Sequence, residues 1–188
     1  MNTFLPYKSF IKSAQCLDYR RLGKQRVEAW QIYLALTQKN YGWKNHPIVK
    51  MWKGYEQALL DYGMVMCEEW INRGYQDTMW ERFYNVFDKK WYAHKDFSKF
   101  YPNWLGNKKF HSSMRSNLLR KDEKHYSKFN WKEKNNLPYY WIRDKMKKKC
   151  KCNRKKGIVC DYHFFPRTRA GYERFLVGNS KTGQSYPH

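Results

Sequence analysis

The sequence predicts a mainly α-helical protein: a compact helical domain around a long central helix, with a small basic C-terminal extension. Apolar residues recur at spacings of three and four through residues 47–74, which is typical of a helix buried along one face. Capping residues precede several of the apolar stretches. Three of the five cysteines stand near the C-terminus among many lysines. We place the helical domain at residues 1–140 and the extension at residues 141–188.

Turn and cap signals define the first elements. Residues 1–7, MNTFLPY, are expected to lie extended against the helical body, because proline disfavours a helix in the residue before it. A short helix over residues 8–17 follows, with Ser9 as its N-cap. Asp18 is expected to cap the next helix, which runs to about residue 38.

This second helix contains the stretch LDYRRLGKQRVEAWQIYLAL, residues 17–36. Val27, Trp30 and Leu34 fall at i, i+3 and i+7, so they predict an apolar stripe that faces the core.

Arg21, Gln25 and Glu28 form a second line on the same helix, one that need not face the core. A lone acid among cations has two interpretations. It belongs to a charge-balanced surface helix, since Lys24 and Glu28 form an i, i+4 pair, or it is a catalytic acid beside bound phosphate.

The third helix is predicted to be the central one, and it begins at Pro47, which suits a first helical turn. Arg73 and Gly74 supply a cationic last turn and a left-handed stop. Gly54 and Gly63 interrupt the helix, so we expect close packing against another backbone there. The apolar positions are Ile48, Met51, Trp52, Tyr55, Leu59, Tyr62, Met66 and Trp70.

The rest of the helical domain is less regular. Residues 76–101 are aromatic and weakly patterned, which favours one more helix or a structured loop. Residues 103–121 predict a loop and then a helix that starts near Gly106 and Asn107. The inward positions of that helix are Phe110, Met114 and Leu118, and the outward positions are Lys109, Arg115 and Arg120.

The net charge of +22, from 38 Lys and Arg against 16 Asp and Glu, indicates a polyanionic partner. Residues 121–156 interleave lysines with aromatic residues, as nucleic-acid-binding surfaces do, so nucleic acid is the leading candidate. A membrane surface is the alternative, but anchoring there needs a basic amphipathic helix or a lipidation signal. The sequence has neither a twenty-residue apolar run nor a signal peptide. We therefore expect an intracellular monomer that is not secreted.

The C-terminal cysteines form the pattern C-x-C-x7-C-x2-H, with Cys150, Cys152, Cys160 and His163 as its members. Three thiolates and one imidazole are the ligand set of a closed tetrahedral zinc centre. Four protein ligands leave no open coordination position, so we assign this zinc to folding of the extension. The alternative is a set of free thiols in a basic tail.

Several segments resemble the pyrimidine dimer DNA glycosylases of the phage endonuclease V type. Asn45-His46-Pro47-Ile48-Val49, followed by an apolar helix and Arg73-Gly74-Tyr75, resembles their central helix. Tyr19-Arg20 and Arg26-Val27 resemble their DNA-contacting helix. The segments MNTFLPY, RLGKQRVE and FHSSMRSNLLRK resemble a longer bacterial and viral branch of the family, so the likeness extends over roughly residues 1–140.

The resemblance implies a helical base-excision enzyme that binds double-stranded DNA and needs no cofactor for its chemistry. In the family, the N-terminal α-amine attacks the sugar carbon of the damaged nucleotide and forms an imine, and strand cleavage follows by elimination. An α-amine keeps a substantial neutral fraction near neutral pH, which suits this role. A glutamate of the second helix handles protons, and arginines hold the backbone.

Two positions depart from the family pattern. Arg21 stands where the family glutamate is expected, so we assign that role to Glu28, with Asp18 as the alternative. The chain begins with Met1 before Asn2, whereas the family exposes a small residue. The attacking amine is therefore that of Met1, or that of Asn2 after removal of Met1. The third alternative is that the protein lacks the lyase step.

Candidate DNA-binding residues are cations and histidines near these segments, and their loss should weaken binding to all sequences. These DNA-binding candidates are Arg20, Arg21, Lys24, Arg26, His46, His111 and Arg115, and a histidine in such a place is more often structural.

Two other functions stay open: a glycosylase for another damaged or modified pyrimidine, and a non-catalytic zinc-containing nucleic-acid-binding protein.

Overall fold

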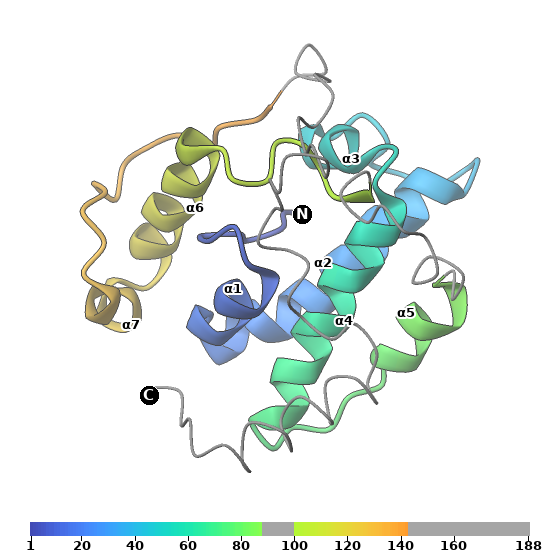
Figure 1. Cartoon of the computed structure of the whole chain (residues 1–188), viewed down its shortest axis with the longest axis horizontal. Coiled ribbons are helices and arrows are strands. Elements are labelled where there is room, and N and C mark those ends of the chain that lie inside the picture. The colour runs from blue at the N-terminus through green and yellow to red at the C-terminus, as the bar shows by residue number, and fades with distance from the viewer. Residues whose placement is uncertain (88–99, 143–188) are drawn as a thin grey trace, which may run out of the picture. The chain divides into compact units, whose positions relative to one another are not determined.

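The computed structural model describes residues 1–87 and 100–142, which form a helical body without strands in these ranges (Figure 1). The mainly α-helical class is therefore confirmed for this part of the chain. No described helix has the length and apolar character needed to cross a membrane. The helices are α1 (Phe10–Cys16), α2 (Tyr19–Thr37), α3 (Pro47–Trp52), α4 (Glu56–Asn72), α5 (Trp80–Val86), α6 (Lys108–Lys121) and α7 (Glu123–Tyr126), and a 3₁₀ turn covers Ser127–Phe129.

Helix starts follow the predicted caps. Ser9 accepts a hydrogen bond from a first-turn amide of α1 at 3.2 Å. Asp18 accepts from two amides at the start of α2, at 3.0 and 3.1 Å. Asn107 accepts a hydrogen bond from one amide in the first turn of α6, at 3.1 Å. Each cap supplies an acceptor to amides that have no partner within the helix, which is why these starts could be read from the sequence.

The prediction of one long central helix was wrong, because the segment divides into α3 and α4. Gly54 lies between them with φ +82°, a conformation that other residues rarely adopt, and its amide donates to Glu56 at 2.8 Å. The predicted start at Pro47 and the left-handed stop at Gly74, with φ +84°, are both confirmed. The apolar spacing continues across the break, so it could not reveal the bend.

The predicted buried stripe of α2 was also wrong. Val27 is 43% exposed, and Trp30 and Leu34 are only partly buried. The buried residues of α2 are apolar residues together with Gln25 and Glu28, and Gln25 contacts Tyr62 of α4. Because these two residues are polar, the buried face does not appear as an apolar pattern in the sequence. They are tolerated there because hydrogen bonds satisfy them.

Residues 1–5 have no helical turn, as the sequence predicted, and they lie between α2 and α6, with a bend that begins at Pro6 (Figure 1). Gln25 of α2 accepts a hydrogen bond from the Phe4 amide at 2.7 Å. His111 and Arg115 of α6 bind the two carbonyls that follow, each at 2.7 Å. An extended segment without a sheet partner needs side chains for its polar groups, and two helices provide them here.

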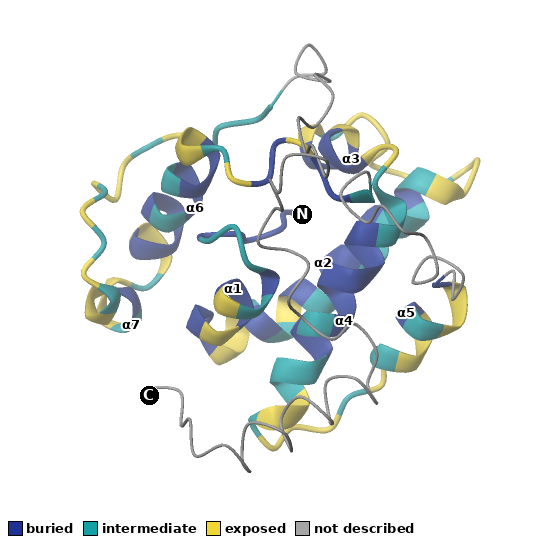
Figure 2. Ribbon diagram, in the orientation of Figure 1, coloured by how far each residue is buried: buried dark blue, intermediate teal, exposed yellow. Residues whose placement is uncertain are grey.

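Aromatic rings fill the space enclosed by the helices, whose buried faces turn inward (Figure 2). Phe10 contacts Tyr62 edge-to-face with ring centroids 5.3 Å apart, and Trp52 contacts Trp104 in the same way at 5.1 Å. Trp52 is completely buried. Such edge-to-face pairs add to the stabilisation from burial, so these tryptophans serve packing.

Gly63 of α4 is in close contact with a side chain, and not with the backbone that was expected. A Cβ at this position would lie 2.4 Å from the ring of Phe83. That ring is completely buried and packs edge-to-face on Trp30. Glycine is therefore required here by the position of an aromatic ring.

We expect Gly63→Ala to lower the free energy of unfolding by about 1–3 kcal/mol in denaturant titrations, because overpacking outweighs the better helix propensity of alanine. Gly42→Ala is the control, since nothing lies within 4 Å of its Cβ position. Adding Phe83→Leu to Gly63→Ala should recover part of the loss. Equal stability of Gly63→Ala and the original protein would contradict this explanation.

Candidate active site

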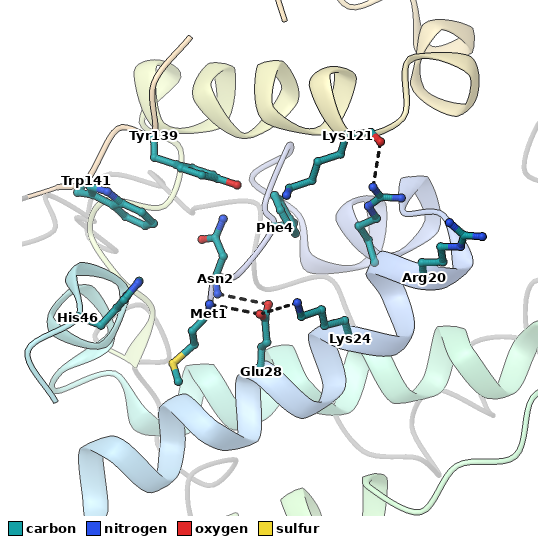
Figure 3. A pocket seen from close by; sticks show the side chains of 11 residues that line it. Met1, Asn2, Phe4, Arg20, Lys24, Glu28, His46, Lys121, Tyr139 and Trp141 are labelled. Carbon is teal, nitrogen blue, oxygen red and sulfur yellow. Dashed lines mark hydrogen bonds and ion pairs between the residues drawn. The ribbon is translucent and has the colours of Figure 1, made fainter. Parts of the chain in front are cut away.

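A cavity of about 520 Å³ lies where the N-terminal segment, α2, the start of α3 and the end of α6 come together (Figure 3). Among the described residues that line it, Glu28 alone has a carboxylate. The lining residues are Met1, Asn2, Phe4, Arg20, Arg21, Lys24, Glu28, His46, Lys121, Tyr139 and Trp141.

The Glu28 carboxylate lies at the inner wall of this cavity with 8% of its side chain exposed. Its Oε1 is 3.4 Å from the Met1 amine and 3.8 Å from Lys24 Nζ. Its Oε2 accepts from the Asn2 amide at 3.3 Å and from Gln25 Nε2 at 2.9 Å. A buried carboxylate needs such donors to stay charged, and these contacts also fix the start of the chain.

Gln25 fixes the position of this carboxylate. Its Oε1 accepts from the Phe4 amide at 2.7 Å and from the Tyr62 hydroxyl at 2.6 Å. A backbone N–H can only donate, so Oε1 must face Phe4 and Nε2 must face Glu28. Burial, and then Glu28, raise the pKa of Tyr62 well above its usual value, which keeps the hydroxyl protonated as a donor.

The Met1 amine and Glu28 are therefore arranged as a potential nucleophile and a proton acceptor. An ammonium group must lose a proton before its nitrogen can attack carbon. The Glu28 carboxylate oxygen lies 3.4 Å away, forms an ion pair with the amine and can receive the proton. The arrangement is suited to imine formation with an electrophilic carbon held in the cavity.

Cations surround the carboxylate on the side of α2 and α6. The Lys24 side chain is 73% exposed, whereas Arg21 binds Asp18 at 3.4 Å and the Lys121 carbonyl at 3.0 Å. Arg20 is exposed and donates to the Tyr19 hydroxyl at 2.9 Å. These groups can hold anionic oxygens at the edge of the cavity.

Aromatic rings form the opposite wall. Tyr139 and Trp141 stack with centroids 5.2 Å apart and planes 24° apart. Trp141 also meets His46 edge-to-face at 5.9 Å. Nδ1 of His46 accepts from the Ile48 amide at 3.2 Å, so this histidine caps α3 as well as lining the cavity. A flat ligand can stack against this wall.

Arg26 was a candidate DNA-binding residue, but the structure does not bring it to the cavity. Its guanidinium forms an ion pair with Asp77, whose side chain is 1% exposed. It also lies over the ring of Trp70, 4.2 Å from the centroid. Arg26 thus links α2 to the segment after α4.

His111, Arg115 and Asp18 also lie outside the cavity lining. His111 accepts from the Gly106 amide at 2.9 Å, which leaves Nδ1 to donate to the N-terminal segment. Arg115 was expected to point outward, yet it binds Glu133 at 2.5 Å. Asp18, the alternative acid, is a buried helix cap that accepts from a tyrosine hydroxyl at 2.5 Å. All three have structural partners.

The zinc ligands predicted from the sequence, Cys150, Cys152, Cys160 and His163, lie outside the described residues, so that site stays a prediction. Among the described residues, no group of three or more His, Cys, Asp or Glu side chains could hold a metal ion.

Five residues of this site received no individual role from the sequence: Gln25, Phe4, Lys121, Tyr139 and Trp141. Gln25 shared a helix line with Glu28, which was a usable signal. Lys121 was one lysine among many in a basic stretch. Only the structure, in which α6 ends at this residue, shows that it lines the cavity.

Comparison with known families gives one match: residues 1–81 match the family described as pyrimidine dimer DNA glycosylase. The matched part contains α1 to α4 and most of the cavity lining, and it confirms the resemblance for these residues. It ends before the segment FHSSMRSNLLRK. No curated protein and no solved structure gives a significant match.

We expect Gln25→Leu to lower the free energy of unfolding by about 1–3 kcal/mol, since it leaves the Phe4 N–H without its acceptor and removes the shorter of the two hydrogen bonds of the Tyr62 hydroxyl. Chemical denaturation measures the effect. Gln15→Leu, an exposed change on α1, is the control and should have little effect. Similar stability of the two variants would show that Gln25 does not anchor the N-terminal segment.

His46 should make folding sensitive to mild acid. Burial, and then the positive N-terminus, lower its pKa below the usual 6.5. A histidine with a lowered folded-state pKa contributes stability that is fully present above the unfolded pKa and is lost as the pH falls below it.

His46→Asn retains an N-cap but does not titrate. From about pH 7.5 to about pH 5, the original protein should lose more unfolding free energy than His46→Asn does. Parallel pH dependences of the two proteins would contradict this role of His46.

Proposed function

We propose, from the match of residues 1–81 to the pyrimidine dimer DNA glycosylases, that this protein excises pyrimidine dimers from DNA and cleaves the strand at the abasic site. One observation carries the proposal. The amine of Met1 lies 3.4 Å from a nearly buried carboxylate, that of Glu28, in a cavity edged by cations. The chemistry that follows uses only groups of this cavity.

The charges of the cavity suit a DNA substrate. A base inside a duplex is out of reach, so an enzyme that acts on it must extrude the nucleotide and hold the flanking phosphates. Arg20 and Lys24 are exposed at the cavity edge and can bind phosphate oxygens. Tyr139 and Trp141 offer a stacked pair against which an extruded base can lie.

In the first step, Glu28 accepts a proton from the Met1 ammonium, and the neutral amine attacks C1′ of the damaged nucleotide. A bond forms between nitrogen and C1′ while the bond from C1′ to the base breaks, and the electron pair leaves with the base. Opening of the sugar ring then gives an imine. Glu28, 3.4 Å away, holds the ammonium group in place until the proton is transferred.

In the second step, the imine acts as an electron sink. A proton leaves C2′, the electron pair forms a double bond, and the 3′ phosphate departs, which cleaves the strand. Hydrolysis of the imine then frees the amine. Glu28 is the carboxylate available to move these protons.

The geometry accommodates either residue as the source of the amine. If Met1 is removed, the nitrogen of Asn2 becomes the α-amine, and that nitrogen already lies 3.3 Å from Glu28 Oε2. Loss of one residue would therefore keep the amine beside the same carboxylate.

We expect Glu28→Gln to reduce base release and strand cleavage by about 10²- to 10⁴-fold, because glutamine keeps a hydrogen-bonding group but cannot take a proton. Strand-cleavage assays and borohydride trapping should use DNA carrying a pyrimidine dimer, other modified pyrimidines or an abasic site. Exposed Glu123→Gln serves as the control, and thermal unfolding checks that both variants fold.

Undiminished activity in Glu28→Gln would overturn the role of this carboxylate. Cleavage at another modified pyrimidine but not at dimers would change the substrate. The absence of cleavage and trapping on every DNA tested would leave a nucleic-acid-binding protein.

A further inference from the structure

We propose that Lys121 is a second imine-forming amine of the cavity, one that reacts with an abasic sugar independently of the chain's N-terminus. This inference rests on the proposed function, since it needs abasic DNA in the cavity.

The end of α6 places this amine in the cavity. Lys121 is the last residue of the helix, and its carbonyl accepts a hydrogen bond from Arg21 of α2 at 3.0 Å. From this anchored position the side chain passes over Phe4, with Nζ 5.9 Å from the ring centroid (Figure 3). Lys121 lines the same cavity as Met1 and Glu28.

Lys121 differs from the other lysine of the cavity. Lys24 is 73% exposed and forms an ion pair with Glu28 at 3.8 Å. No ion pair of Lys121 Nζ with an acid occurs among the described residues, and Glu28 already faces the N-terminus and Gln25. Lys121 thus lines the cavity without a counter-ion in this part of the chain, although its side chain is also reached by solvent.

These surroundings favour the neutral amine. Burial lowers the pKa of Lys121, and the neighbouring cations Arg21, Arg120 and Lys24 lower it further. A lysine whose charged form is disfavoured in this way is a stronger nucleophile near neutral pH than a lysine without such a shift.

The reaction needs only the abasic site itself. Nζ attacks the C1′ aldehyde of the ring-opened sugar, a carbon–nitrogen bond forms, and the aldehyde oxygen leaves as water to give an imine. Loss of a C2′ proton then expels the 3′ phosphate, and hydrolysis returns the lysine. Lys121 thereby supplies strand cleavage at abasic sites without taking part in base release.

The test uses the full chain and DNA containing an abasic site, with borohydride to reduce the imine to a stable amine. Proteolysis and mass spectrometry then map the modified residue. We expect part of the adduct on Lys121, its loss in Lys121→Arg, and a fall in total trapping of at least about twofold. Arginine keeps the charge but stays protonated, so it cannot form the imine. Lys109→Arg, an exposed change on the same helix, is the matched control and should leave trapping unchanged.

The possible results separate this inference from the proposed function. Adducts on Lys121 alone would support the inference and remove the N-terminal amine from the mechanism. Adducts only at the N-terminal residue, with equal trapping in Lys121→Arg, would overturn the inference and leave the proposed function intact. If Lys121→Met then weakens DNA binding, Lys121 is a phosphate contact only. Absence of any trapped species would overturn both.

Discussion

The rest of the site depends on the burial of the N-terminal segment between α2 and α6. An extended segment without a neighbouring strand brings unpaired amides and carbonyls into the interior, and each would cost stability if left alone. Gln25, His111 and Arg115 satisfy these groups from the two helices. The contacts hold the beginning of the chain in one position. Because the first residue is fixed in this way, its amine becomes part of the cavity wall.

The same contacts join stability to chemistry. Gln25 binds the N-terminal segment with its oxygen and Glu28 with its nitrogen, so one buried amide sets the position of both the amine and the carboxylate. Tyr62, a hydroxyl donor from α4, completes this arrangement. Such a network is specific because rotation of the Gln25 amide would break its hydrogen bonds to Phe4, Tyr62 and Glu28 together. Polar residues in the core are thus explained by the site they position.

Local signals in the sequence were reliable where the physics is local. A cap such as Ser9 or Asp18 bonds amides within its own helix, and a left-handed stop such as Gly74 depends on its own backbone angle. The division at Gly54 and the buried face of α2 were not recovered. A glycine in an apolar helical pattern does not reveal which conformation it adopts, and buried polar residues look like surface residues until their partners are known.

By itself, the sequence determined the helical class, the starts of α1, α2, α3 and α6, the basic character and Glu28 as the candidate acid. Only the tertiary structure placed that acid beside Met1 and Asn2, the latter 26 positions away along the chain. It also separated Lys121, which enters the cavity, from Arg26 and Arg115, which are held by Asp77 and Glu133. The start of a helix depends on neighbouring residues, whereas the partner of a long lysine or arginine side chain depends on which elements pack together. The fold therefore decided which of many similar charges face the cavity.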